Sequence, residues 1–79
     1  MNMDLGTWSG RVLAAIRAEM ASQHRTSTAL ADVLGVTEPT VATRLDGETT
    51  FDLVEIERVA GWLGLSPSEL VARADDRAA

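Results

Sequence analysis

Residues 26–47 read TSTALADVLGVTEPTVATRLDG, and this stretch predicts two short helices joined by a tight turn. Thr26 and Thr37 each precede a run of helical periodicity, where a hydroxyl group can cap the first turn. Gly35 suits the left-handed conformation that ends the first helix without a β-carbon penalty. Apolar contacts between the two helices would come from Leu30, Leu34, Val36 and Val41. The stretch therefore predicts a helix-turn-helix over about residues 27–46.

One helix is expected before this pair and another after it. The preceding one starts at Thr7 or Ser9 and runs to about Ser22, with apolar residues at helical spacing. The following one begins at a capping box formed by Asp52 and Glu55, and Gly64 stops it. The buried face of this helix is expected to comprise Leu53, Ile56, Val59, Ala60 and Leu63.

A last helix is predicted near the end of the sequence. It begins at a second capping box, Ser66 to Glu69, with Pro67 at its first position. We expect it to end near Ala74 and residues 75–79 to be frayed. No stretch alternates apolar and polar residues as a strand would. The expected fold is an all-α, compact five-helix arrangement that forms one domain over residues 1–79.

The composition argues against several kinds of site. There is no cysteine and only one histidine, His24, so neither a disulfide framework nor a metal site is expected. No nucleophile with a neighbouring base and no glycine-rich phosphate loop is visible, so we expect no enzyme, cofactor or small-molecule ligand. The longest apolar run, residues 12–16, is far shorter than the ~20 residues that span a bilayer. We therefore expect a cytoplasmic protein without a membrane partner.

Further residues downstream strengthen the pattern of the opening stretch. They are the run Thr40-Val41-Ala42-Thr43-Arg44-Leu45-Asp46-Gly47, then Phe51, Glu55, Val59-Ala60, Leu63-Gly64-Leu65 and Pro67. With them, residues 11–74 resemble the lambda-repressor/Cro-type (XRE-like) helix-turn-helix family, in the form common in actinobacteria and their phages. The resemblance implies a DNA-binding domain whose second helix-turn-helix helix enters the major groove. It also implies a homodimer, at least on DNA, that binds a pseudo-palindromic site.

The resemblance also implies which residues touch DNA. The expected base contacts are Glu38, Pro39, Thr40 and Thr43. The expected backbone contacts are Arg25, Thr26, Ser27, Thr28, Arg44, Gly47, Thr49 and Thr50. Ser27 stands where the family often has a glutamine, and Arg25 and Arg44 stand where apolar residues are usual. Asp46 occupies a position near the backbone, where a carboxylate should repel DNA.

Each of these residues also has a plainer interpretation. Thr40 and Thr43 either contact bases or form an ordinary polar surface. Glu38 either accepts a hydrogen bond from a cytosine N4 or complements the helix dipole. Arg25 and Arg44 either reach phosphates or are ordinary surface arginines.

A tryptophan in the fourth predicted helix suggests a second contact surface. Trp62 follows Val54 and Arg58 at intervals of four residues, on a flank away from the apolar stripe. Because aromatic residues are enriched at interfaces, we interpret these three residues as a possible self-association site. Either a neighbouring subunit or a chain terminus would cover the Trp62 ring, or the ring is simply exposed.

The charge balance bears on function. Seven arginines and 12 acidic residues give a net charge of −5, whereas nucleic-acid binders are usually basic. We take this acidity as an argument against tight non-specific binding, but not against DNA binding itself. The expected function is a sequence-specific transcriptional regulator that binds double-stranded operator DNA, a Cro-like or immunity-type phage repressor. The alternative is an acidic helix-turn-helix module that binds another regulator, as an antirepressor would.

Overall fold

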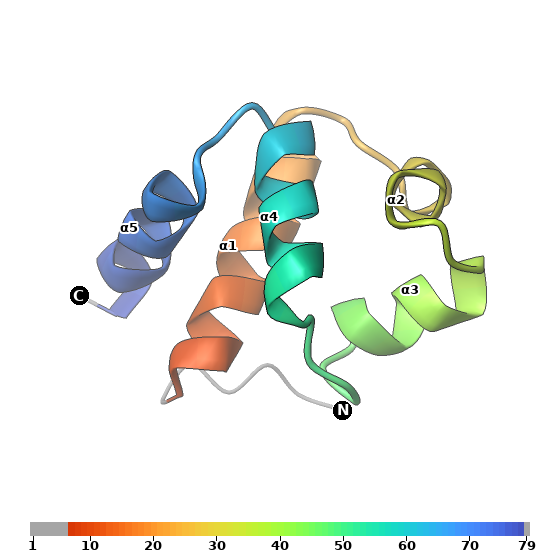
Figure 1. The fold of residues 1–79 in the computed structure, drawn as a ribbon. Helices are drawn as coiled ribbons and strands as arrows, with labels where there is room; N and C mark the ends of the chain where they lie inside the picture. Colours follow the sequence, from red (N-terminus) through yellow and green to blue (C-terminus); the bar gives the residue numbers. More distant parts are fainter. Residues whose placement is uncertain (1–6, 79) are drawn as a thin grey trace.

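The computed structural model describes residues 7–78 of the 79-residue chain, with side chains described to Asp76. Within this range the protein is all-helical, without a strand, and its helices follow one another as shown in Figure 1. They are α1 (Trp8–Ser22), α2 (Ser27–Leu34), α3 (Glu38–Leu45), α4 (Leu53–Trp62) and α5 (Pro67–Ala78). None of these described helices is long and apolar enough to cross a membrane. The predicted all-α five-helix fold is therefore confirmed.

Side-chain caps begin the helices where the sequence predicted them. The hydroxyl groups of Thr7, Thr26 and Thr37 accept hydrogen bonds from the first turns of α1, α2 and α3. Asp52 and Glu55 form the predicted capping box of α4, with both reciprocal hydrogen bonds present. The second capping box begins α5 and is described below. These caps satisfy backbone N–H groups that have no partner within the helix.

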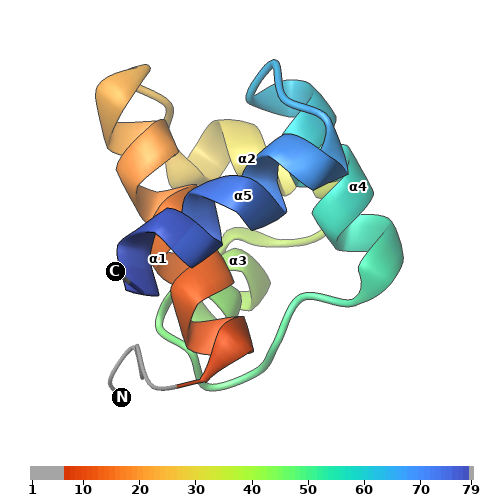
Figure 2. The ribbon, with the colours of Figure 1, turned by 90° about the vertical axis from the view of Figure 1, so that its left-hand side faces the viewer.

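The helices are arranged in three layers. In Figure 1, α1 and α4 form the middle layer, α5 lies on one side, and α2 and α3 lie on the other. Figure 2 shows α5 crossing in front of α1, with α2 and α3 behind. Ile16, Leu30, Val41, Val59 and Leu70 are completely buried where the layers meet. Every helix therefore contributes to one core, as a chain of this size requires.

Two expectations about α4 and α5 differ from the structure. Leu53, expected in the buried face of α4, is 80% exposed. It is the first residue of the helix and lies where α4 has not yet reached the core. Helix α5 does not end near Ala74 but continues to Ala78. The residues after Ala74 include no glycine or proline, and alanine and arginine favour the helical conformation. Residue 79, the last of the segment expected to fray, lies outside the described residues.

Candidate nucleic-acid interface

The α2–α3 pair has the geometry of a helix-turn-helix. Gly35 adopts a left-handed conformation with φ 70°, and the Val36 N–H donates to the Ala31 carbonyl oxygen at 3.1 Å. Leu30, Leu34 and Val41 are buried between the helices and the middle layer. Because the turn is closed by backbone bonds and the inner faces are apolar, α3 is held rigidly on α2 with its other side turned outward.

Val41 is the one buried residue of α3, and much of the helix is uncovered. We define the outer surface of α3 as the residues that face away from Val41 together with the first residue of the helix: Pro39, Ala42, Thr43, the C-cap residue Asp46, and Glu38. All of these residues are exposed except Thr43, which is half-buried. Among the predicted base contacts, Glu38 and Pro39 are thus exposed, whereas Thr40 and Thr43 are partly covered. Ala42 was not singled out from the sequence, although the helical spacing from Val41 places it outward.

Glu38 links the first turns of the two helices. The Thr28 hydroxyl, at the start of α2, donates to Glu38 Oε1 at 3.0 Å. Both residues are exposed. The carboxylate therefore has a defined position at the rim of the outer surface, and its second oxygen remains available as an acceptor.

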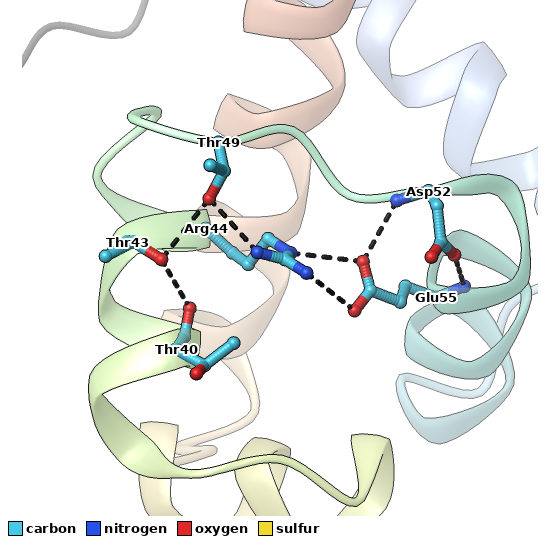
Figure 3. Close-up of polar contacts among 6 residues, drawn as sticks. All are labelled: Thr40, Thr43, Arg44, Thr49, Asp52 and Glu55. Atoms are coloured by element: carbon cyan, nitrogen blue, oxygen red, sulfur yellow. Dashed lines mark hydrogen bonds and ion pairs between the residues drawn. The ribbon is translucent and has the colours of Figure 1, made fainter.

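Arg44, a predicted phosphate contact, is engaged within the domain. Its Nε donates to Glu55 Oε1 at 3.1 Å and its Nη2 to Glu55 Oε2 at 3.3 Å, a bidentate ion pair between α3 and α4 (Figure 3). The two side chains are 22% and 12% exposed. Glu55 Oε1 also accepts from the Asp52 N–H at 3.0 Å as part of the capping box. The Arg44 charge is therefore matched by a carboxylate in a partly desolvated position.

The loop after α3 is fastened by Arg44 and Thr43. Gly47 has φ 83°, which turns the chain so that the Glu48 N–H donates to the Thr43 carbonyl at 3.0 Å. Arg44 Nη1 donates to Thr49 Oγ1 at 3.1 Å, and Thr49 Oγ1 donates to Thr43 Oγ1 at 3.2 Å. Thr49 and Thr50 are exposed, as the predicted backbone contacts require. The loop thus covers one flank of α3.

Arg25 lies at the opposite end of α4. Its guanidinium stands over the Trp62 ring, 5.0 Å from the ring centroid, and Nη2 donates to the Trp62 carbonyl oxygen at 3.1 Å. Its Nε donates to Gln23 Oε1 at 3.3 Å. His24, between them in sequence, adopts a left-handed conformation with φ 55°, which turns the chain between α1 and α2. Arg25 is exposed, and so are Thr26, Ser27 and Thr28 at the start of α2.

The three predicted self-association residues differ in exposure. Val54 is 54% exposed and Arg58 is exposed, whereas Trp62 is half-buried under Arg25. A neighbouring subunit or a chain terminus was expected to cover the Trp62 ring, and Arg25 partly covers it instead. Leu53, which the sequence placed in the buried face of α4, instead borders an apolar groove of about 160 Å³ between the starts of α1 and α4, together with the half-exposed Trp8.

The charges around α2 and α3 are mostly negative. Between Arg25 and Thr50 the chain has two arginines and four acidic residues, and all four acids are exposed. These acids are Asp32, Glu38, Asp46 and Glu48. Because Arg44 is paired with Glu55, Arg25 is the one cation of this segment that is not matched by a carboxylate. The residues of this segment therefore attract a phosphate backbone only weakly.

Comparison with known proteins identifies the family. No curated protein and no solved structure matches the chain. The family model of the BetR domain matches residues 9–79, which is nearly the whole chain. The BetR domain is a helix-turn-helix-like family, which agrees with the α2–α3 geometry. The chain belongs to the BetR domain family and is a helix-turn-helix regulatory domain.

Proposed function

We propose that this domain binds double-stranded DNA sequence-specifically and regulates transcription, with α3 in the major groove. The observation that carries the proposal is that α3 buries only Val41 and leaves its outer surface uncovered. The helix is held at the edge of the domain by α2, so it can enter a groove without any change in the fold (Figure 1). Glu38, Pro39 and Thr43 would contact base edges there, and Thr40 would lie beside them.

The expected phosphate contacts are at the two ends of the α2–α3 pair. At one end, Arg25 stands beside the start of α2, where the Thr26 and Ser27 hydroxyl groups and uncapped N–H groups can bind a phosphate oxygen. At the other end, the loop over residues 47–50 presents exposed threonine side chains. With Arg25 as the one unmatched cation between residues 25 and 50, we expect a shallow dependence of affinity on salt, since each neutralised phosphate contributes roughly −0.9 to the log–log slope.

The mode of action follows from the family resemblance. A two-fold dimer on a pseudo-palindromic operator is the expected complex, and occupation of a promoter would make the protein a Cro-like or immunity-type repressor. Val54 and Arg58 on the exposed flank of α4 are the residues expected to contact the second subunit.

A second function is favoured by the four exposed acids between Arg25 and Thr50. An acidic helix-turn-helix surface suits a basic protein partner, such as the DNA-binding surface of another regulator. The two functions differ in what the outer surface of α3 would bind.

Selection of bound sequences from a random duplex pool at low salt tests the proposal. We expect one motif to be enriched. The variant Ala42→Asp, on the outer surface of α3, should weaken binding to that motif at least tenfold by adding a charge against the bases. Ala72→Asp is the matched control, because Ala72 is exposed on α5 in the opposite layer. No binding to any duplex would contradict DNA binding and favour the acidic interaction module.

A further inference from the structure

Three hydrogen bonds form a chain that runs from Arg44 through Thr49 and Thr43 to the Thr40 carbonyl. The groups at the two ends of this chain determine which atom donates in each bond. At one end, the Arg44 guanidinium can only donate, so Thr49 Oγ1 accepts from it at 3.1 Å. At the other end, the Thr40 carbonyl oxygen can only accept, and Thr43 Oγ1 donates to it at 2.8 Å. Between them, the Thr49 hydroxyl donates to Thr43 Oγ1 at 3.2 Å. The single hydroxyl hydrogen of Thr43 is therefore used inside the domain.

The Arg44 guanidinium stays beside Thr49 because Glu55 holds it in place. The bidentate pair with Glu55 orients the guanidinium, and the low exposure of both side chains opposes its separation by solvent. Separating the pair would leave the Glu55 carboxylate, 12% exposed, without its cation. Arg44 thus acts as a positioning residue for Thr43 through Thr49.

The side chain of Thr43 consequently directs its methyl group away from the domain. Figure 3 shows its hydroxyl oxygen turned toward Thr49 and Thr40, while its methyl group points away from them. The remaining lone pair of the hydroxyl can only accept a hydrogen bond. Thr43 therefore offers a methyl group, and at most an acceptor, to any molecule that contacts α3.

The other side chains of the outer surface of α3 share this character. Pro39 and Ala42 are apolar, and Pro39 also lacks a backbone N–H. Glu38 and Asp46 carry carboxylates, which accept hydrogen bonds and do not donate. The hydroxyl of Thr40 lies on the flank, outside this surface, and shares a hydrogen bond with Thr37 Oγ1 at 3.0 Å in which either hydroxyl can be the donor. Thus none of the five side chains that form this surface has a donor available to a base.

We infer that the outer surface of α3 reads thymine methyl groups and the exocyclic amino groups of cytosine and adenine, and makes no contact with guanine O6 or N7. The inference rests on the proposed function, because it assumes that α3 lies in the major groove. Guanine presents two acceptors there, which are normally bound by arginine or lysine. Thymine presents a C5 methyl group that packs against small apolar side chains, and the cytosine N4 amino group donates to carboxylates.

Modified bases in the selected operator test the inference without altering the protein. Replacing each thymine by uracil removes only the C5 methyl group, and replacing each guanine by 7-deazaguanine removes only the N7 acceptor. We expect uracil to lower affinity about fivefold or more at one or more positions in each half-site. We expect 7-deazaguanine to change affinity less than twofold at every position. The inference is overturned if 7-deazaguanine weakens binding severalfold or if no uracil does.

A matched pair of variants assigns the methyl contact to Thr43. Thr43→Ser removes the methyl group and keeps the hydroxyl, whereas Thr43→Val removes the hydroxyl and keeps the methyl. We expect Thr43→Ser to bring the thymine-to-uracil affinity ratio close to one at one position, and Thr43→Val to retain that ratio. The reverse result, or no change in either variant, would contradict the role of Thr43. Failure of any duplex to be enriched would instead overturn the proposed function together with this inference.

Discussion

Each end of α4 is held by an arginine from another part of the chain, Arg44 of α3 or Arg25 of the α1–α2 connection, but the two arginines have different partners. At the N-terminal end, Arg44 forms a bidentate ion pair with Glu55 and is 22% exposed. At the C-terminal end, Arg25 stands over the Trp62 ring and donates to a carbonyl and an amide oxygen, all of them neutral groups. The charge of Arg44 is therefore matched by a carboxylate, whereas the charge of Arg25 has no carboxylate partner.

An arginine at a position expected to contact DNA is available to a phosphate only if no carboxylate of the domain already binds it. Both arginines stand where the resemblance suggests phosphate contact, and the sequence offered no reason to separate them. The structure provides one, because a guanidinium already bound by a carboxylate gains little from a phosphate that would have to displace it. We therefore expect Arg25 to serve binding and Arg44 to serve the position of α3 and its loop.

We expect the largest effect on stability from removing the Trp62 ring at the C-terminal end of α4. Trp62→Ala should lower the free energy of unfolding by about 2 kcal/mol, less than the 3–5 kcal/mol typical of fully buried aromatic residues, because Trp62 is half-buried. Chemical denaturation measures this change. Trp62→Phe keeps an aromatic ring under Arg25 and should lose less than half as much. A loss below about 0.5 kcal/mol would show that the ring does not support this end of α4.

A smaller loss is expected at the N-terminal end. Glu55→Ala removes the capping-box side chain and leaves Arg44 without its carboxylate, so stability should fall by about 1–2 kcal/mol. Glu57→Ala is the control, since Glu57 is exposed on the same helix and should change stability by about 0.5 kcal/mol or less. Equal losses in the two variants would mean that the ion pair contributes nothing.

The salt dependence of duplex binding separates the two arginines directly. Arg25→Ala should make the log–log slope shallower by about 0.9, the value for one phosphate contact. Arg44→Ala should leave the slope unchanged while it lowers affinity for the operator more than for an unrelated duplex. Arg73→Ala, on α5 in the opposite layer, is the control and should change neither quantity. A shallower slope for Arg44→Ala would show that Arg44 leaves Glu55 and binds a phosphate.

The smallest effect concerns the capping box that follows the C-terminal end of α4. The Ser66 backbone N–H donates to Glu69 Oε1 at 2.8 Å, and this bond, together with the Ser66 hydroxyl and Arg73, lowers the pKa of Glu69. Because the pKa is lower in the folded state, the contribution to stability is present above the unfolded pKa. It is lost as the pH falls through the folded pKa.

An NMR titration of the side-chain carboxyl groups should therefore place the midpoint of Glu69 below that of an ordinary glutamate. Ser66→Ala removes the hydroxyl and should move the midpoint upward, while the backbone bond keeps it partly lowered. Glu69→Gln should flatten the pH dependence of stability in the acidic range. An unchanged midpoint in Ser66→Ala would show that the hydroxyl has no part in the shift.

The start of nearly every helix could be predicted from the sequence because caps are local. The side chains of Thr26, Thr37 and Asp52 each bind a backbone N–H three residues away. Each cap therefore depends on only four consecutive residues. Gly35 and Gly64 likewise mark helix ends by their own backbone preference, with φ 70° and 78°. The all-α fold and the helix-turn-helix follow from such local signals together with the apolar spacing.

The partners of the long polar side chains depend on contacts between residues that are distant in the sequence. Arg44 and Glu55 are 11 residues apart, and Arg25 and Trp62 are 37 apart, so their pairing depends on how α2 and α3 pack on α4. The same packing places the residue 47–50 loop beside α3 and thereby turns the Thr43 hydroxyl inward. Sequence periodicity locates a side chain on a face of a helix, but its rotamer and its partners are set by long-range contacts. For that reason the sequence determined that α3 has an outer surface, while the packing determined which atoms that surface presents.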